Sequence, residues 1–118
     1  MKRIISTSIG IGLFAFGLMA ADKPSYPGGE AALNKYLTEN LKYPSYAAEN
    51  GVEGVVTVGF LVMPDGSIKN AKVVKLVDPD LEKEALRLVN GMPAWVPAEE
   101  GGVSVEAPAS VNVPFILE

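Results

Sequence analysis

The sequence contains no cysteine and no histidine, and these two absences exclude many kinds of site. Zinc fingers, iron–sulfur clusters, Ser–His and Cys–His catalytic pairs and a histidine general base each lack a required residue type. Disulfide bonds cannot form, so the fold must be stabilised by its core. Positive charge is also scarce, because 10 lysines and arginines are outnumbered by 14 acidic residues and the net charge is −4. Nucleic acid and anionic membrane surfaces are usually met by a basic face, so neither is an expected partner.

The N-terminus has the pattern of a secretory signal. It begins with Lys2 and Arg3, continues through the apolar and uncharged residues 9–19, and ends in two small alanines. An uncleaved membrane anchor is the alternative, because the uncharged run over residues 4–21 reaches the lower limit of about 18 residues for a spanning helix. We therefore predict three segments, which are a signal peptide or short anchor over residues 1–21, a short linker over 22–27 and one domain over 28–118.

Residue patterns within this domain predict an α+β fold. Helical spacing of apolar residues and runs of β-branched residues alternate along the chain. Helices packed on one face of a three-stranded antiparallel sheet satisfy the resulting order α-α-β-β-α-β. The expected helices cover residues 30–41, 45–50 and 79–90, and the expected strands cover residues 52–63, 68–77 and 105–117.

Several residues are typical of helix ends and turns. Asp78 is predicted to cap the third helix with Pro79 at its first position, and Gly91 ends that helix. Ser45 is predicted to cap the second helix. The segment Pro64-Asp65-Gly66-Ser67 indicates a tight turn, so the first two strands should form a hairpin.

The composition of each strand predicts its place in the sheet. Residues 52–63 are apolar on both faces, as expected for a central strand. Strict alternation along the next strand puts Ile68 on one face with Val74 and Leu76, and puts Val73 on the other. Residues 94–104 are expected to form a loop.

The last strand is expected at the edge of the sheet. Pro108 and Pro114 lie within it, and a proline cannot donate to a ladder of hydrogen bonds. Pro114 should therefore point its nitrogen away from the neighbouring strand. The backbone groups of Ser110, Asn112 and Ile116 would then also point outward.

An ordered set of short motifs runs through most of the domain. Its members are Leu41-Lys-Tyr-Pro44, Asn50-Gly51, Glu53-Gly54, Pro64-Asp65-Gly66, Asp80, Leu81, Ala85, Met92-Pro93, Trp95, Pro97 and Val113-Pro114-Phe115. In this order they resemble the C-terminal domain of TonB, and the lead Pro27-Gly28-Gly29-Glu30 is similar to the version common in Bacteroidetes-type bacteria. The resemblance covers about residues 26–118, and the ordered set carries it rather than any single motif.

The resemblance implies a periplasmic protein-binding module that is not an enzyme and needs no cofactor or small-molecule substrate. TonB proteins couple an inner-membrane helix to the ExbB–ExbD motor and grip the TonB box of outer-membrane TonB-dependent transporters. This chain has no histidine in its N-terminal segment, and its linker over residues 22–27 reaches only about 20 Å when extended. Both departures argue against coupling to ExbB–ExbD, and neither argues against partner binding.

The resemblance also implies where the partner binds, because a TonB-box segment adds as a strand beside the last strand of the family domain. The alternative is an edge that proline blunts against aggregation. Two other functions stay open, namely a domain that binds other envelope partners and a membrane-anchored energy transducer with an uncleaved N-terminus. The candidate partner-binding residues are Ser110, Val111, Asn112, Val113, Phe115 and Ile116.

Other conspicuous residues have structural explanations. Trp95 is expected to cover the end of the third helix in the core, because large aromatic side chains mostly pack. The acidic residues Asp78, Asp80, Glu82 and Glu84 lie at the start of that helix, where the helix dipole favours negative charge. We therefore expect neither a metal site nor a catalytic pair.

Overall fold

The computed structural model describes residues 23–118, so the predicted signal or anchor over residues 1–21 lies outside the described residues. The predicted order of helices and strands is confirmed, with one short hairpin added before the last strand. The elements are α1 (Glu30–Asn40), α2 (Ser45–Glu49), β1 (Gly54–Val62), β2 (Ile68–Lys75), α3 (Pro79–Asn90), β3 (Ala98–Glu100), β4 (Val103–Val105) and β5 (Ala107–Phe115).

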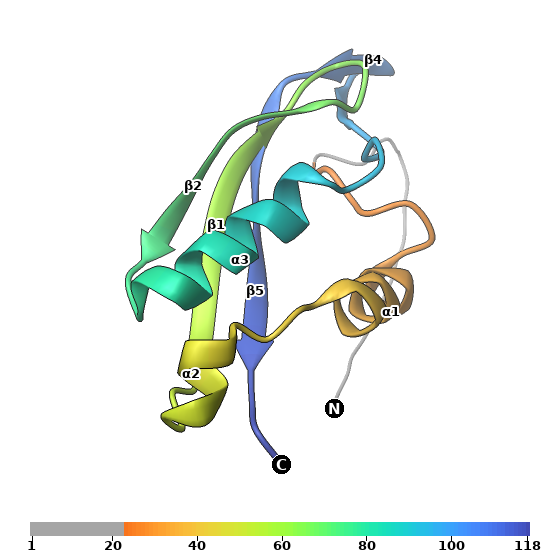
Figure 1. Cartoon of the computed structure of the whole chain (residues 1–118). Coiled ribbons are helices and arrows are strands. Elements are labelled where there is room, and N and C mark those ends of the chain that lie inside the picture. Colours follow the sequence, from red (N-terminus) through yellow and green to blue (C-terminus); the bar gives the residue numbers. More distant parts are fainter. Residues whose placement is uncertain (1–22) are drawn as a thin grey trace.

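The main sheet has three antiparallel strands in the order β2-β1-β5. β1 is the central strand, as its apolar composition predicts, and β5 lies at an edge. The pairing of β1 with β5 runs without interruption from Gly54 opposite Phe115 to Val62 opposite Ala107. Figure 1 shows α3 crossing one face of this sheet, with α1 beyond β5.

The core lies between α3 and the sheet. Alternate residues of β1 and β5 point toward the helix, and these positions are almost all apolar and fully buried. Burial of such side chains is the main favourable term in folding. The buried residues are Val56, Val58, Phe60 and Val62 from β1, Val111, Val113 and Phe115 from β5, and Leu81, Ala85, Leu88 and Val89 from α3.

The ends of α3 are as predicted, whereas the start of α2 is not. The carboxylate of Asp78 accepts hydrogen bonds from the backbone amides of Asp80 and Leu81, and Gly91 is the C-cap. Ser45, in contrast, is the first residue of α2 rather than its cap. Pro44 takes the N-cap position there and makes no side-chain capping bond.

The strict alternation predicted for the second strand is wrong. The pairing of β2 with β1 is irregular at two places, and Asn70 adopts a positive φ of 58°. Asparagine tolerates this left-handed conformation, which is common at bulges and turns. The bulge changes the face of the residues that precede it, so Ile68 packs against the core with Ala71 and Val73 instead of lying with Val74.

The loop predicted over residues 94–104 contains a short hairpin. β3 and β4 pair antiparallel through Ala98 opposite Val105 and Glu100 opposite Val103. The turn between them is made by Gly101 and Gly102, both with positive φ. Each strand has three residues, which is too short for a recognisable alternation.

Candidate partner-binding edge

The two edges of the sheet differ in how open they are to another strand. The β2 edge carries the exposed lysines Lys69, Lys72 and Lys75 and is interrupted by the irregular register. Charged side chains and bulges are the usual protection of an edge against pairing. The β5 edge has a regular register and no charged residue.

The two prolines of β5 fix the direction of its backbone groups. Pro108 lies opposite Leu61 and Pro114 opposite Val55, so both prolines occupy the same alternate set of positions. If the backbone groups at these positions faced β1, the hydrogen bonds between the two strands would lack the N–H donors of both prolines. The regular strand therefore points the N–H and C=O groups of this set, which includes Ser110, away from β1.

The pair formed by Thr57 and Asn112 supports this assignment. They lie directly opposite each other, and the Thr57 hydroxyl donates a hydrogen bond to the Asn112 side-chain carbonyl at 2.8 Å. Side chains approach most closely at the positions of an antiparallel pair that do not exchange backbone bonds. The backbone groups of Asn112 thus face the free side of β5, like those of Ser110.

The structure divides the six candidate partner-binding residues into three groups. Ser110 and Asn112 are exposed and lie between the two prolines. Val111, Val113 and Phe115 have their side chains in the core and hold the strand in place. Ile116 follows the end of β5, and its side chain is 67% exposed. The free edge is therefore centred on Ser110 and Asn112.

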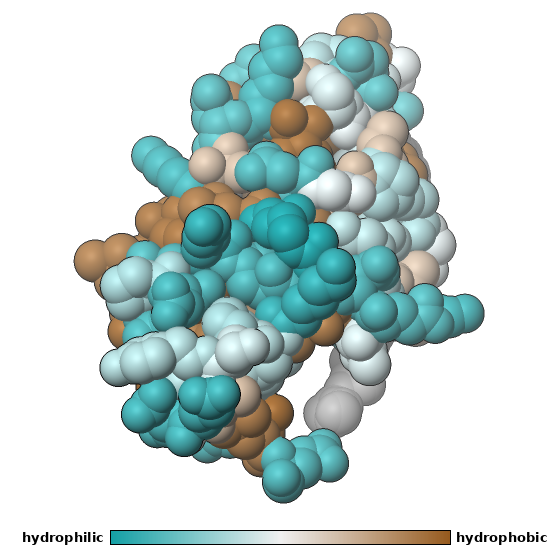
Figure 2. All heavy atoms as spheres, viewed as in Figure 1, coloured by the Kyte–Doolittle hydropathy of each residue, from teal (hydrophilic) through white to brown (hydrophobic). Residues whose placement is uncertain are grey.

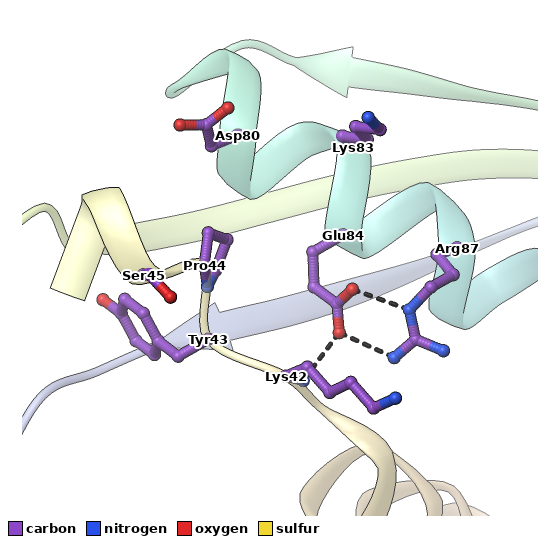
Figure 3. Close-up of a pocket in the computed structure, with 8 residues that line it drawn as sticks. All are labelled: Lys42, Tyr43, Pro44, Ser45, Asp80, Lys83, Glu84 and Arg87. Carbon is purple, nitrogen blue, oxygen red and sulfur yellow. Dashed lines mark hydrogen bonds and ion pairs between the residues drawn. The ribbon is translucent and has the colours of Figure 1, made fainter.

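A buried acidic residue holds the segment before α2 against α3. The Glu84 carboxylate accepts a hydrogen bond from the backbone amide of Lys42 at 2.6 Å, and it forms an ion pair with Arg87 at 2.7 Å. These groups line a pocket of about 410 Å³, and Figure 3 shows how they meet there. Next to Lys42, the ring of Tyr43 packs edge-on against Phe115 with ring centres 5.6 Å apart. The bond to Glu84 therefore also supports the end of β5.

The environment of Glu84 changes its acidity. Burial raises the pKa of this carboxyl, but the hydrogen bonds from Arg87 and from the Lys42 amide outweigh that effect, so its pKa lies below the ordinary value. The sequence pattern explains Glu84 only as one of several acids near the start of α3. Its bond to Lys42 could not be predicted, because Lys42 is distant in sequence. The other acids act separately. Asp78 caps α3, and Glu82 accepts a bond from the Val77 amide at 2.8 Å.

Trp95 is a core residue, as predicted. Its ring packs edge-on against Phe60 and Tyr26 at centre distances of 5.1 and 5.8 Å. The Trp95 amide donates to the Gly66 carbonyl at 2.9 Å, which fixes the turn between β1 and β2. The sequence predicts a linker at Tyr26, but the residue is only 9% exposed and belongs to the core.

One group of exposed apolar residues lies at the end of β2, away from the β5 edge. Val74, Leu76 and Val77 are 57%, 79% and 39% exposed, and Figure 2 shows hydrophobic surface at the left of the view, near the end of β2. Within residues 23–118 no group of three acidic side chains is arranged to hold a metal ion, and no helix is long and apolar enough to cross a membrane.

Comparisons with known proteins agree with this geometry. The profile of the family described as Gram-negative bacterial TonB protein C-terminal matches residues 39–117. A solution structure of the Helicobacter pylori TonB C-terminal domain is similar with a TM-score of 0.58 and 24% identity, over 73% of this chain and 78% of that chain. A shorter fragment of the same domain gives a TM-score of 0.55 and 23% identity, over 72% of this chain and 89% of that one. The search of curated proteins gave no significant match.

The solved structures support the fold, and the profile match supports the family. Domains of this family are in general periplasmic modules for protein interaction. The match extends over most of the chain, from the end of α1 to the residues after β5. The chain therefore belongs to the family of Gram-negative bacterial TonB protein C-terminal domains.

Proposed function

We propose that this protein binds the TonB box of outer-membrane TonB-dependent transporters by adding that segment as a strand beside β5. The observation that carries the proposal is the regular, uncharged edge of β5, which has no strand beside it among residues 23–118. Strand addition needs such an edge, because backbone hydrogen bonds provide the affinity. The protein then acts as a binding module in the periplasm rather than as an enzyme.

The two prolines define how much of the edge is available. Between Pro108 and Pro114, the amides of Ser110 and Asn112 are the outward donors. Each backbone hydrogen bond contributes only about 0.5–1.5 kcal/mol net, so a short partner segment binds weakly through its backbone alone. The side chains of the partner must supply the rest of the affinity.

An NMR titration of the isotopically labelled full chain in mild detergent tests the proposal. The ligands are TonB-box peptides from transporters of the same organism, with scrambled peptides as controls. We expect shifts concentrated on residues 110–116 for the TonB-box peptides alone. If millimolar peptide causes no shift, the domain does not bind transporters, and other envelope partners become the subject of the search.

A pair of substitutions at one position separates backbone from side-chain recognition. Asn112→Pro removes an outward amide, whereas Asn112→Ala keeps that amide and removes only the side chain. We expect the proline variant to abolish the peptide-induced shifts and the alanine variant to retain them. Equal binding by both variants would argue against pairing along β5.

We also propose that the mature protein is free in the periplasm after removal of its signal. N-terminal sequencing of the protein recovered from its own cells tests this. A chain that begins near Asp22 supports an adaptor or competitor of a full-length TonB. A chain that begins at Met1 supports a membrane-anchored energy transducer instead.

A further inference from the structure

A pocket of about 240 Å³ opens beside the free edge of β5. Ser110 is the β5 residue that lines it, and the other walls come from the first turns of α1, from the segment before that helix and from Trp95. Figure 1 shows α1 beyond β5, on the side where the sheet has no further strand. Because the backbone of Ser110 faces outward, a strand added along β5 passes the mouth of this pocket.

The wall opposite β5 is held firmly by the rest of the domain. The backbones of Ser25 and Val96 exchange two hydrogen bonds of 3.0 and 2.8 Å. Tyr26 is buried against Trp95, and Leu33 is partly buried against the core. The pocket is thus formed before any partner arrives, so little ordering is required when a ligand binds.

Most of the wall precedes the residues that the family profile matches. The family profile matches residues 39–117, whereas the pocket residues of α1 and its leading segment lie between residues 24 and 33. The matched residues supply the strand edge together with Trp95, and residues 24–33 supply the rest of the pocket beside it.

The chemistry of the lining indicates what fits. Tyr26, Leu33 and Trp95 present apolar surface, and among residues 23–118 Glu30 is the only charged residue that lines the pocket. We propose that the pocket receives one apolar side chain of the strand that pairs with β5 and rejects an acidic side chain there. This inference rests on the proposed function and adds a partner-selecting position to it.

Position scanning of one peptide tests the inference on the full chain. Each residue of a TonB-box peptide is replaced in turn by alanine and by aspartate, and the affinity is measured by NMR titration. At one position we expect about a four- to fifteenfold loss for alanine, corresponding to one or two methylene groups leaving apolar surroundings. We expect a larger loss for aspartate there, and peptide-induced shifts at residues 24–33.

A charge reversal with a matched control identifies the pocket. Glu30→Lys should recover about two- to fivefold of the aspartate loss at that position, the size expected for a solvent-accessible charge pair. Glu39→Lys changes the net charge equally on the same helix but does not line this pocket, and it should recover nothing. Glu30→Gln gives a milder version if the reversal disturbs α1.

The outcomes separate this inference from the proposed function. The pocket's proposed role is refuted if peptides bind at residues 110–116 but no peptide position is sensitive to substitution. It is also refuted if Glu30→Lys and Glu39→Lys recover the aspartate loss equally. In both cases the proposed function stands. Absence of all peptide binding overturns both.

Discussion

Replacing Glu84 by alanine should destabilise the protein more than any other single change to its acidic residues. The carboxylate is buried, with the residue 8% exposed, and it accepts bonds from the Lys42 amide and from Arg87. Alanine would leave that amide without its acceptor and would release the segment before α2 from α3. Tyr43, which follows Lys42, would then be less well held against Phe115.

The size of the effect follows mainly from the bond to the Lys42 amide. A hydrogen bond to a charged group contributes about 1.5–3 kcal/mol. The ion pair adds little to this, because the Arg87 side chain is 49% exposed and can be solvated when its partner is lost. We expect Glu84→Ala to lower the free energy of unfolding by about 2–3 kcal/mol and the melting temperature by about 10 °C or more.

Urea and thermal unfolding followed by circular dichroism measure this loss. Glu39→Ala is the matched control, because Glu39 is exposed on α1 and its side chain makes no hydrogen bond or ion pair with any of residues 23–118. Exposed substitutions of this kind usually change stability by less than about 0.5 kcal/mol. A loss for Glu84→Ala within that range of the control would refute the reasoning.

Three further predictions concern acid, the hairpin turn and the cap of α3. Because the pKa of Glu84 lies below its ordinary value of 4.5, its stabilisation should be complete above that pH and lost as pH falls through the lower folded-state pKa. Stability–pH curves should show this dependence weakened in Glu84→Gln, and identical slopes would contradict it. Gly66→Ala should cost more than Gly101→Ala in chemical denaturation. Both glycines have positive φ, but a Cβ at position 66 would collide with the Trp95 carbonyl oxygen, whereas no atom of residues 23–118 would lie within 4 Å of a Cβ at position 101. Asp78→Ala should lower the free energy of unfolding by about 1 kcal/mol through loss of the N-cap, whereas Asp78→Asn should retain most of it; equal losses would exclude the capping role.

The elements that could be predicted from the sequence are those with local signals. α3 is bounded by Asp78 and Gly91, each of which acts on its immediate neighbours. The turn at Gly66 lies between two runs of β-branched residues, so the hairpin of β1 and β2 is evident. The central place of β1 follows from its apolar residues on both faces.

The features that could not be predicted depend on tertiary contacts or on single residues. The left-handed backbone of Asn70 shifts the register of β2. Nothing in the sequence around this asparagine requires that conformation. Glu84 resembles the acids around it, although it alone bonds to Lys42 across the fold. The burial of Tyr26 depends on its contact with Trp95, which is distant along the chain.

For the candidate site, the edge could be predicted but the pocket could not. Pro108 and Pro114 mark an edge strand. Both occupy the same alternate set of positions, which gives the direction of the backbone N–H and C=O groups between them. The pocket forms because the segment before α1 packs against Trp95. No periodicity in the sequence predicts that contact. Sequence patterns thus located an open strand edge, and the structure added a pocket beside it, which we propose as the site that selects a side chain of the partner.

The spacing of Pro108 and Pro114 has a consequence for self-association. An open, uncharged strand edge invites a second copy of the same strand, and a full-length match would seed aggregation. If two copies of β5 paired, each proline would lack the N–H that donates a ladder hydrogen bond. The two copies could therefore not pair without interruption over the whole length of Ala107–Phe115. A short segment that needs only the interval between the prolines loses none of these bonds. The same two residues that leave the edge open to a short partner segment therefore limit how far β5 can pair with a second copy of itself.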